Sequence, residues 1–362
     1  ISLRQTPAAG QRLALVLANY PTRNSRLANG VGLDTPASAA ALLHWLQEAG
    51  YGLGSEALPM DGEALIRSLT QGRTPDPESW HLPALAALPL QDYQCWYEQL
   101  PKGARSLIEA QWGPPEHDAG LGPDGFPICG LGFGSVLVLL QPSRGYDRDP
   151  SLNYHSPDLP PTHAYLAHYL WIRESFAAHA IVHLGKHGNL EWLPGKGIGL
   201  SDQCFPELAL GPWPHLYPFI VNDPGEGSQA KRRSQALILD HLTPPLGRAG
   251  LHGDLAALEG LLDEYWEANQ MGSDRQTLLR QQLQDRFERL ELPLGAAGAN
   301  DWETRLNQAD GYLCELKEAQ IRTGLHIYGQ QPGPGAFDEL LLAIARAPGP
   351  VSYTHLTLPT KA

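Results

Sequence analysis

Three consecutive stretches of sequence decide the fold class: RLALVLAN (12–19), YPTRNSRLANGVGLD (20–34) and TPASAAALLHWLQEAG (35–50). The first is a short run rich in Leu and Val, which is typical of a buried strand. The last predicts a helix, with Thr35 as its N-cap and Gly50 as its C-terminal cap. A strand, a long loop and a helix in this order indicate the start of an α/β unit.

The same kinds of segment recur along the chain. The runs SVLVLLQ (135–141) and AIVHL (180–184) predict two more strands, and THAYLAHYLWIRESFAA (162–178) predicts a helix between them. Helical spacing of apolar residues extends over 255–291, and a further helical segment covers 301–322. We therefore predict an α/β fold of mostly parallel sheet units with long Gly- and Pro-rich loops, plus a helical C-terminal portion.

These segments divide the chain into four predicted parts. Residues 1–130 form an α/β segment with a helical insertion, and residues 131–250 form an α/β segment with the motifs HGNLEW and AKRR. Residues 251–347 are mainly helical. Residues 348–362 have the character of a non-native tail. The chain begins with Ile1 and not with Met, so we expect it to be a cut from a longer protein.

Composition excludes several classes of protein. Gly (38) and Pro (32) together make about a fifth of the 362 residues but have no triplet period, which excludes collagen. The net charge of −13 argues against nucleic-acid binding. No apolar run reaches the length of a membrane span. The four cysteines show no CxxC spacing, which fits a reducing compartment, and we predict a cytoplasmic protein.

The densest cluster of chemically active side chains is His183, His187 and Glu191. This N/O ligand set suits a borderline divalent metal such as cobalt or zinc. The spacing of a zincin would require a helix with Glu at position 184, but that residue is Leu and glycines follow it. We expect the three side chains to lie at a strand end and in a glycine loop, where α/β sheets bind ligands. The alternative is that His183 is an ordinary core histidine.

Cations stand out in this acidic chain and can bind carboxylates. Ser228 is predicted to cap a helix that carries a basic run in its first turns, which the helix dipole opposes. A solvated helix face is the alternative. His241 is expected at the end of that helix. The cations concerned are Lys186, Lys196, Lys231, Arg232 and Arg233.

Aromatic residues near these loops can form the walls of a pocket for a large flat ligand, or simply pack in the core. They are Trp192, Trp213, Tyr217 and Phe219.

At these residues the sequence resembles the family of aerobic cobaltochelatase large subunits, the CobN type. The resemblance is carried by IVHLGKHGNLEWLPGKGIGLSDQCFPELALGPWPHLYPFIVNDPGEGSQAKRR (181–233), and it extends to LANYPTRNSRLANGVGLDTPAS, LQPSRGYDRDPSLNYHSPDLPPTHAYLA, DHLTPPL and KEAQIRTGLHIYGQ. Magnesium chelatase large subunits have a similar HGSLE-type loop, but the segment NDPGEG and the sequence GKHGNLEW favour the cobalt branch.

The resemblance implies insertion of Co(II) into hydrogenobyrinic acid a,c-diamide, a corrin precursor. It also implies ATP hydrolysis, with Mg(II), by an AAA+-type ATPase subunit and its adaptor subunit, which agrees with the missing Walker motif in this chain. Glu191 and His187 are then the expected catalytic residues, and His183, His187 and Glu191 the expected metal-handling set. The expected substrate-binding residues are Lys231, Arg232, Arg233, Lys186, Lys196, Asn19, Arg23, Arg26, Asn29 and Tyr217.

Three other functions stay open from the sequence: a magnesium chelatase subunit acting on protoporphyrin IX, a non-catalytic tetrapyrrole-binding scaffold, and a zinc hydrolase. The chelatase interpretation requires four loops to converge on one place. The zinc hydrolase requires a helix over 183–191. The four loops are 19–32, 145–160, 185–197 and 222–233.

Overall fold

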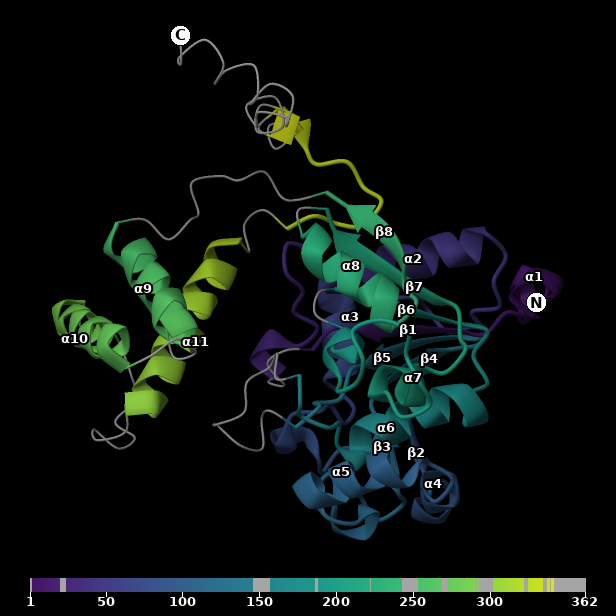
Figure 1. Cartoon of the computed structure of the whole chain (residues 1–362). Helices are drawn as coiled ribbons and strands as arrows, with labels where there is room; N and C mark the ends of the chain where they lie inside the picture. Colours follow the sequence, from purple (N-terminus) through teal and green to yellow (C-terminus); the bar gives the residue numbers. More distant parts are fainter. Residues whose placement is uncertain are drawn as a thin grey trace, which may run out of the picture. The chain divides into compact units, whose positions relative to one another are not determined.

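The computed structural model divides the chain into two compact units (Figure 1). The first comprises Ile1–Thr243 and His326–Pro332, and the second comprises Pro244–Leu325 and Gly333–Ala362. The division of the sequence into four parts stays a prediction, and the suspected tail lies outside the described residues. The structure describes residues 2–19, 24–145, 157–185, 188–221, 223–242, 253–268, 273–290, 292, 302–321, 325–334, 337–338 and 340–341.

A six-stranded sheet forms the centre of the first unit, with the order β4-β5-β1-β6-β7-β8. Strands β5, β1, β6, β7 and β8 run parallel, and β4 is antiparallel to β5. The mostly parallel sheet predicted from the sequence is therefore confirmed. The strands are β1 (Leu13–Leu17), β4 (Gly130–Phe133), β5 (Val136–Leu140), β6 (Ala180–Leu184), β7 (His215–Ile220) and β8 (Leu237–His241).

The order of the parallel strands has a switch point between β1 and β6. From β1 the chain crosses to β5 on one side, then returns to β6 on the other side and continues outward to β7 and β8. In doubly wound α/β sheets, ligands bind in the crevice outside the carboxyl ends of the two strands at such a point. A ligand site is therefore expected at the loops that follow β1 and β6.

Both faces of the sheet are covered, and β1 is accordingly apolar and buried at every position. Ala14 and Val16 face one hydrophobic cluster, while Leu15 and Leu17 face another, as the two-residue repeat of a strand requires. The first cluster packs on α6 (His163–Leu170), α7 (Phe205–Leu210), α4 (Leu90–Tyr97) and α5 (Lys102–Trp112). The second packs on α2 (Thr35–Glu48) and α3 (Gly62–Leu69).

Several smaller elements complete the first unit. A short sheet pairs β2 (Ala86–Leu88) with β3 (Phe126–Ile128). Helix α1 (Ser2–Gln5) precedes β1, and α8 (Pro224–Arg233) connects β7 to β8. A π-helical turn over Trp171–Ser175 follows α6.

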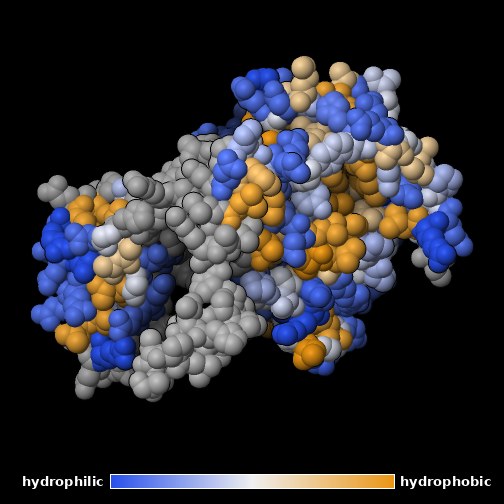
Figure 2. Space-filling model, turned by 90° about the horizontal axis from the view of Figure 1, so that it is seen from above, coloured by the Kyte–Doolittle hydropathy of each residue, from blue (hydrophilic) through white to orange (hydrophobic). Residues whose placement is uncertain are grey.

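The second unit consists of helices in its described part: α9 (Asp254–Ala268), α10 (Ser273–Arg289) and α11 (Trp302–Ile321). Their apolar faces meet in one core that includes Leu258, Leu283 and Leu306. The indole Nε1 of Trp302 donates to the Tyr265 hydroxyl at 2.9 Å. The helical C-terminal portion predicted from the sequence is confirmed. Figure 2 shows many hydrophilic residues on the visible face of this unit.

Two local predictions were wrong. Asp34, and not Thr35, caps α2: its carboxylate accepts a hydrogen bond from the Ala37 amide at 2.9 Å, and Thr35 is the first helical residue. His241 ends strand β8 and not a helix. Among the described helices, none combines the length and the apolar character needed to cross a membrane.

Candidate functional site

The loops that follow β1 and β6 touch at the switch point. The Ala18 amide donates to the Leu184 carbonyl at 2.8 Å. Beyond these residues Gly30 and Gly185 approach so closely that a Cβ built on Gly30 would lie 3.2 Å from the Gly185 Cα. The side chain of Thr35 lies against both glycines. The two loops are therefore packed backbone to backbone.

Glu191 lies in the loop that follows β6, within a short 3-10 turn over Leu190–Trp192. Its side chain is fully buried. The Tyr217 hydroxyl, on strand β7, donates to Oε1 of Glu191 at 3.2 Å and accepts a hydrogen bond from the Gly188 amide at 2.7 Å. Burial, and then the nearby Glu191 carboxylate, raise the pKa of Tyr217, so the phenol stays a neutral donor. Strand β7 thus holds a buried carboxylate in place.

Helix α8 begins earlier than the sequence predicted. Asp223 caps it by accepting from the Glu226 amide at 3.4 Å, so the basic run Lys231 to Arg233 lies in its last turn. The predicted conflict with the helix dipole is therefore wrong, because cations stabilise the C-terminal end of a helix. Lys231 and Arg232 are exposed.

Arg233 is buried and holds the loop that contains Glu191. Its guanidinium donates to the carbonyl oxygens of Glu191 at 2.6 Å, Leu193 at 2.5 Å and Lys196 at 3.1 Å. Gln229, one turn earlier on α8, donates to the same Glu191 carbonyl at 3.1 Å. These contacts use three of the five guanidinium N–H groups to fix the backbone.

Two residues that follow β5 complete the contacts, and neither was predicted from the sequence. Gln141 donates through Nε2 to the Gly188 carbonyl at 2.7 Å. Arg144 is fully buried and donates to the carbonyls of Trp192 at 3.2 Å and Leu159 at 2.7 Å. A polar residue that directly follows an entirely apolar strand was the available signal for Gln141.

His183 belongs to a buried hydrogen-bond chain. Its Nε2 lies 2.8 Å from the Tyr169 hydroxyl and its Nδ1 lies 2.7 Å from Nε2 of His215. Burial first, and then His215 and His168, lower the pKa of His183 well below its usual value, so the ring is neutral. Both ring nitrogens are engaged, and a metal at His183 would have to displace one of these partners.

Four buried polar atoms at this edge of the sheet have no hydrogen-bond partner within the described part of the chain. Such atoms are uncommon, and water or a ligand often satisfies them. Asn189 also has a left-handed backbone, with φ of 54°, which is unusual for a residue other than glycine. The four atoms are Asn19 Nδ2, Thr35 Oγ1, Gln141 Oε1 and Asn189 Oδ1.

The remaining predicted residues fall into two groups. Arg26 and Asn29 are half-buried in the loop after β1, and Lys196 is exposed. Arg23, Lys186 and His187 lie outside the described residues. Within the described residues no group of three or more His, Cys, Asp or Glu side chains is arranged to hold a metal, so the predicted ligand set that includes His187 stays a prediction.

In their described parts, the predicted loops 19–32 and 222–233 each contact the loop 185–197, and Arg144, just before the fourth loop, links that loop to it. Gly30 meets Gly185, Arg233 reaches Glu191, and Arg144 joins the carbonyl of Leu159 to that of Trp192. Residues 183–191 do not form an α-helix in their described part, since β6 ends at Leu184 and a short 3-10 turn begins at Leu190. The arrangement needed by a zinc hydrolase is therefore missing there.

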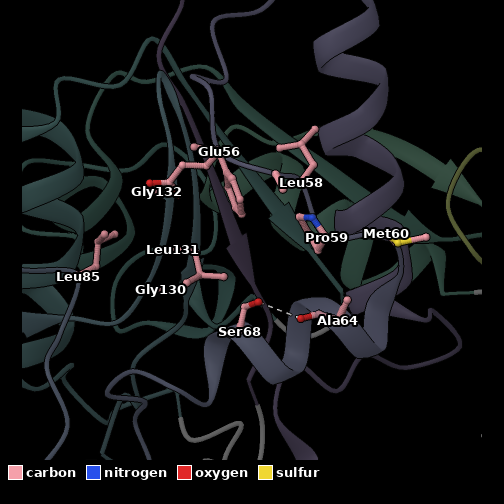
Figure 3. A pocket seen from close by; sticks show the side chains of 12 residues that line it. Glu56, Leu58, Pro59, Met60, Ala64, Ser68, Leu85, Gly130, Leu131 and Gly132 are labelled. Carbon is pink, nitrogen blue, oxygen red and sulfur yellow. Dashed lines mark hydrogen bonds between the residues drawn. The ribbon is translucent and has the colours of Figure 1, made fainter.

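A pocket of about 510 Å³ lies elsewhere, against edge strand β4 and helix α3 (Figure 3). Its wall mixes polar and apolar surface, with Leu58, Met60 and Leu131 among its residues, and Glu56 is its titratable side chain. It has no cluster of groups suited to acid–base or metal chemistry, so the candidate site is the polar switch point.

Comparisons with known proteins agree with the resemblance seen in the sequence. The family model described as CobN/Magnesium Chelatase matches residues 1–359. The chain is 48% identical over 349 residues to the aerobic cobaltochelatase subunit CobN of Pseudomonas aeruginosa, covering 96% of this chain and 28% of that protein. It is 32% identical to a magnesium-chelatase subunit of Chlorobaculum parvum, covering 91% of this chain and 26% of that protein.

A solved structure is similar as well. The catalytic subunit of cobaltochelatase from Mycobacterium tuberculosis shares 42% sequence identity and gives a TM-score of 0.66, covering 96% of this chain and 30% of that chain. The chain therefore spans between a quarter and a third of the length of these relatives.

Proposed function

Because this chain belongs to the CobN/magnesium chelatase family, we propose that it forms the metal- and tetrapyrrole-handling part of a cobaltochelatase large subunit. The reaction is the insertion of Co(II) into hydrogenobyrinic acid a,c-diamide, during the biosynthesis of cobalamin. Co(II) is a substrate in this reaction. The greater identity to the CobN protein, 48% against 32% to the magnesium-chelatase protein, supports the cobalt branch.

The observation that carries the proposal is the buried carboxylate of Glu191 at the switch point of the sheet. Metal insertion releases two pyrrolic protons, so the site needs a base next to the tetrapyrrole. Glu191 is held by the Tyr217 hydroxyl and by the contacts of Arg233 to its backbone, which keeps the carboxylate in one place. We assign proton removal to Glu191 and metal handling to Glu191 together with His187.

Polar atoms at this edge of the sheet that lack a partner among the described residues support a polar ligand. Asn19 offers a donor, whereas Gln141 and Asn189 offer acceptors. The carboxylate side arms of the corrin precursor need cations that are free to move toward them. Lys231 and Arg232 are exposed on the last turn of α8, and we assign them to these arms. Arg233 acts by positioning the loop.

The energy for insertion is assigned to partner subunits. No Walker pattern is present in this chain, so we propose that ATP hydrolysis with Mg(II) takes place on an AAA+-type ATPase subunit that acts through its adaptor subunit in the cytoplasm. Insertion of Mg(II) into protoporphyrin IX is the second candidate, supported by the similarity to the magnesium-chelatase protein of Chlorobaculum parvum. Quenching of tryptophan fluorescence by each tetrapyrrole distinguishes the two.

The test is Glu191→Gln in the full-length subunit, assayed with its partner subunits. We expect tetrapyrrole binding to persist, because the amide keeps the size of the side chain and its oxygen still accepts from Tyr217. We expect cobalt insertion, followed by the absorption of the corrin, to fall by about 100-fold or more. The matched control is Glu98→Gln at the exposed C-terminal end of α4. Undiminished insertion by a folded Glu191→Gln protein would refute the assignment.

A further inference from the structure

The pocket of Figure 3 lies beside the outer edge of the sheet. Strand β4 comes first in the strand order, so within the described sheet it pairs with β5 alone. Four consecutive residues of β4, Gly130 to Phe133, line the pocket. Successive side chains of a strand point to opposite faces. A pocket that borders consecutive residues therefore lies along the backbone edge of the strand and not on one of its faces.

The pairing of β4 with β5 determines where its backbone groups point. The Leu140 amide donates at 2.9 Å to the carbonyl of Cys129, which lies opposite it in the register of the two strands. In an antiparallel pair, residues that bond to the partner strand alternate with residues that do not. Gly132 is three positions beyond Cys129, so its N–H and C=O point away from β5. Among the described residues no other backbone group bonds to them.

The edge of β4 is closed on both sides of Gly132. On one side the Leu85 amide donates to the Ile128 carbonyl at 3.0 Å, and on the other the Ser135 amide donates to the Gly52 carbonyl at 2.6 Å. Between these two bonds, residues 56–60 form the opposite wall of the pocket, and no backbone hydrogen bond within the described residues crosses it. The free part of the edge is therefore a short window that is open to one more extended segment.

The side chains around this window are not those that usually protect a sheet edge. Natural edge strands commonly carry charged residues or Pro, which block pairing with another chain, whereas β4 reads GLGF. Apolar side chains are also exposed beside it: Met60 is 88% exposed and Leu85 is 38% exposed, and both line the pocket. Contiguous exposed apolar groups with polar neighbours are typical of interaction sites.

The charge of the pocket selects the kind of partner. Glu56 is exposed and is the one charged residue among those that line the pocket. None of the ion pairs found among the described residues includes it. A segment that lies in the window therefore meets a carboxylate without a cation of its own, which favours a Lys or Arg in that segment.

We propose that the edge of β4 binds an extended segment of a partner protein as an added strand, with an apolar side chain against Met60 and Leu85 and a Lys or Arg near Glu56. Main-chain hydrogen bonds to Gly132 supply affinity, and the apolar and acidic side chains select the sequence, as in other cases of strand addition. Strand β5 separates this edge from the switch point between β1 and β6. The proposal therefore goes beyond the proposed function and does not rest on it.

Two pairs of variants test the backbone and the charge separately. Gly132→Pro removes the outward N–H and leaves the bonds to β5, and edge strands tolerate Pro at such positions. Its control is Gly132→Ala, which keeps the N–H and whose Cβ would meet the side chains of Leu137 and Leu85 at 3.5 and 3.6 Å, ordinary contact distances. Glu56→Lys reverses the charge, and its control is Glu98→Lys at the exposed end of α4.

The experiment measures the fluorescence anisotropy of a labelled peptide, Thr-Val-Lys-Val-Thr, titrated with the full-length subunit. We expect saturable binding that Gly132→Pro weakens by about tenfold and Glu56→Lys by about fivefold, while both controls bind as the natural protein does. A peptide with Glu in place of Lys should prefer the Glu56→Lys variant. A peptide with N-methylated valines should bind poorly to the natural protein, which tests the main-chain bonds even where Gly132→Pro fails to fold.

Three results would overturn the proposal. The first is the lack of saturable binding at millimolar concentrations of the natural protein. The second is an affinity that the Glu56→Lys variant or the N-methylated peptide leaves unchanged, or a loss in Gly132→Ala equal to that in Gly132→Pro. The third is slow amide hydrogen exchange at Gly132 before any peptide is added, because another part of the full-length subunit would then already occupy the edge.

Discussion

Nδ1 of His183 lies 2.7 Å from Nε2 of His215, and the direction of this hydrogen bond is determined by the groups at the two ends of the chain. Nδ1 of His215 lies 3.0 Å from the Ser234 carbonyl, which only accepts, so Nδ1 carries the hydrogen and Nε2 accepts. His183 must then donate through Nδ1 and accept at Nε2 from the Tyr169 hydroxyl, 2.8 Å away. Each donor in this buried chain therefore has one acceptor.

The first prediction concerns this pair. We expect His215→Leu to lower the free energy of unfolding by about 2–5 kcal/mol, because it leaves the His183 N–H and the Ser234 carbonyl buried without partners. His183→Leu should have a similar effect. The double variant should lose clearly less free energy than the sum of the two single losses, because no imidazole is then left buried without its partner. Guanidinium denaturation of the natural protein, the two single variants and the double variant measures these free energies of unfolding. Strict additivity would contradict the shared hydrogen bond.

The second prediction concerns acid stability. Burial lowers the pKa of His168 to about 3 and, as the largest cause, the pKa of His215 to about 4. The unfolded chain takes up protons at these residues near pH 6.5, whereas the folded chain does so only below pH 4. Stability should therefore fall as the pH drops from about 6.5 to 4, by roughly 1.4 kcal/mol per pH unit for each such histidine.

His168→Leu isolates one contribution to that pH dependence. It removes a buried Nε2 that has no partner among the described residues, so we expect little change in stability at pH 7 and a smaller loss on acidification than in the natural protein. Thermal melting between pH 7 and pH 4.5 measures both. Parallel melting curves for the two proteins over this range would contradict the prediction.

The third prediction concerns the contact between the two loops. Gly185 has a φ of +89°, and a Cβ at this position would lie 2.8 Å from Oγ1 of Thr35 and 3.1 Å from Cβ of Ala18. We expect Gly185→Ala to cost about 1–2 kcal/mol in backbone strain alone and to reduce cobalt insertion. Gly197→Ala, in the same loop but with open space around it, is the control and should match the natural protein in melting temperature and activity.

The fourth prediction separates the cations of α8. Arg233→Ala removes three hydrogen bonds to the loop that contains Glu191, so it should lower the melting temperature and the rate of insertion together. Arg232→Ala removes an exposed side chain and should leave the melting temperature unchanged while weakening tetrapyrrole binding. Melting curves and tetrapyrrole titrations measure these effects. Equal melting temperatures for both variants would contradict the positioning role of Arg233.

The sequence predicted the centre of the fold well because the central strands are apolar throughout. The run 180–184 forms β6 with the predicted bounds, and the strands predicted over 12–19 and 135–141 contain β1 and β5. Strand β7 was missed, since His215 and Pro218 interrupt its apolar pattern. His241 was predicted at the end of a helix, whereas it ends strand β8, because short apolar runs do not distinguish strand from helix.

The candidate site was predictable in its location and less so in its contacts. Loops that follow adjacent parallel strands meet at one edge, which a sequence can indicate. Whether Arg233 turns toward a ligand or toward three carbonyls depends on where α8 begins. The observed cap, Asp223, lies five residues before the predicted cap, Ser228. The partners of His183 come from Tyr169 and His215, which are distant in sequence and became visible only in three dimensions.

The position of β1 in the middle of the sheet has a consequence for synthesis on the ribosome. Leu13 pairs with Val136 on one side and with Ala180 on the other, so its first partner is made 123 residues later. At about 5–20 residues per second, this apolar strand waits roughly 6–25 s before it can join a sheet. During translation β1 is therefore an apolar segment that chaperones are expected to protect, and slower codons before residue 136 would lengthen its exposure.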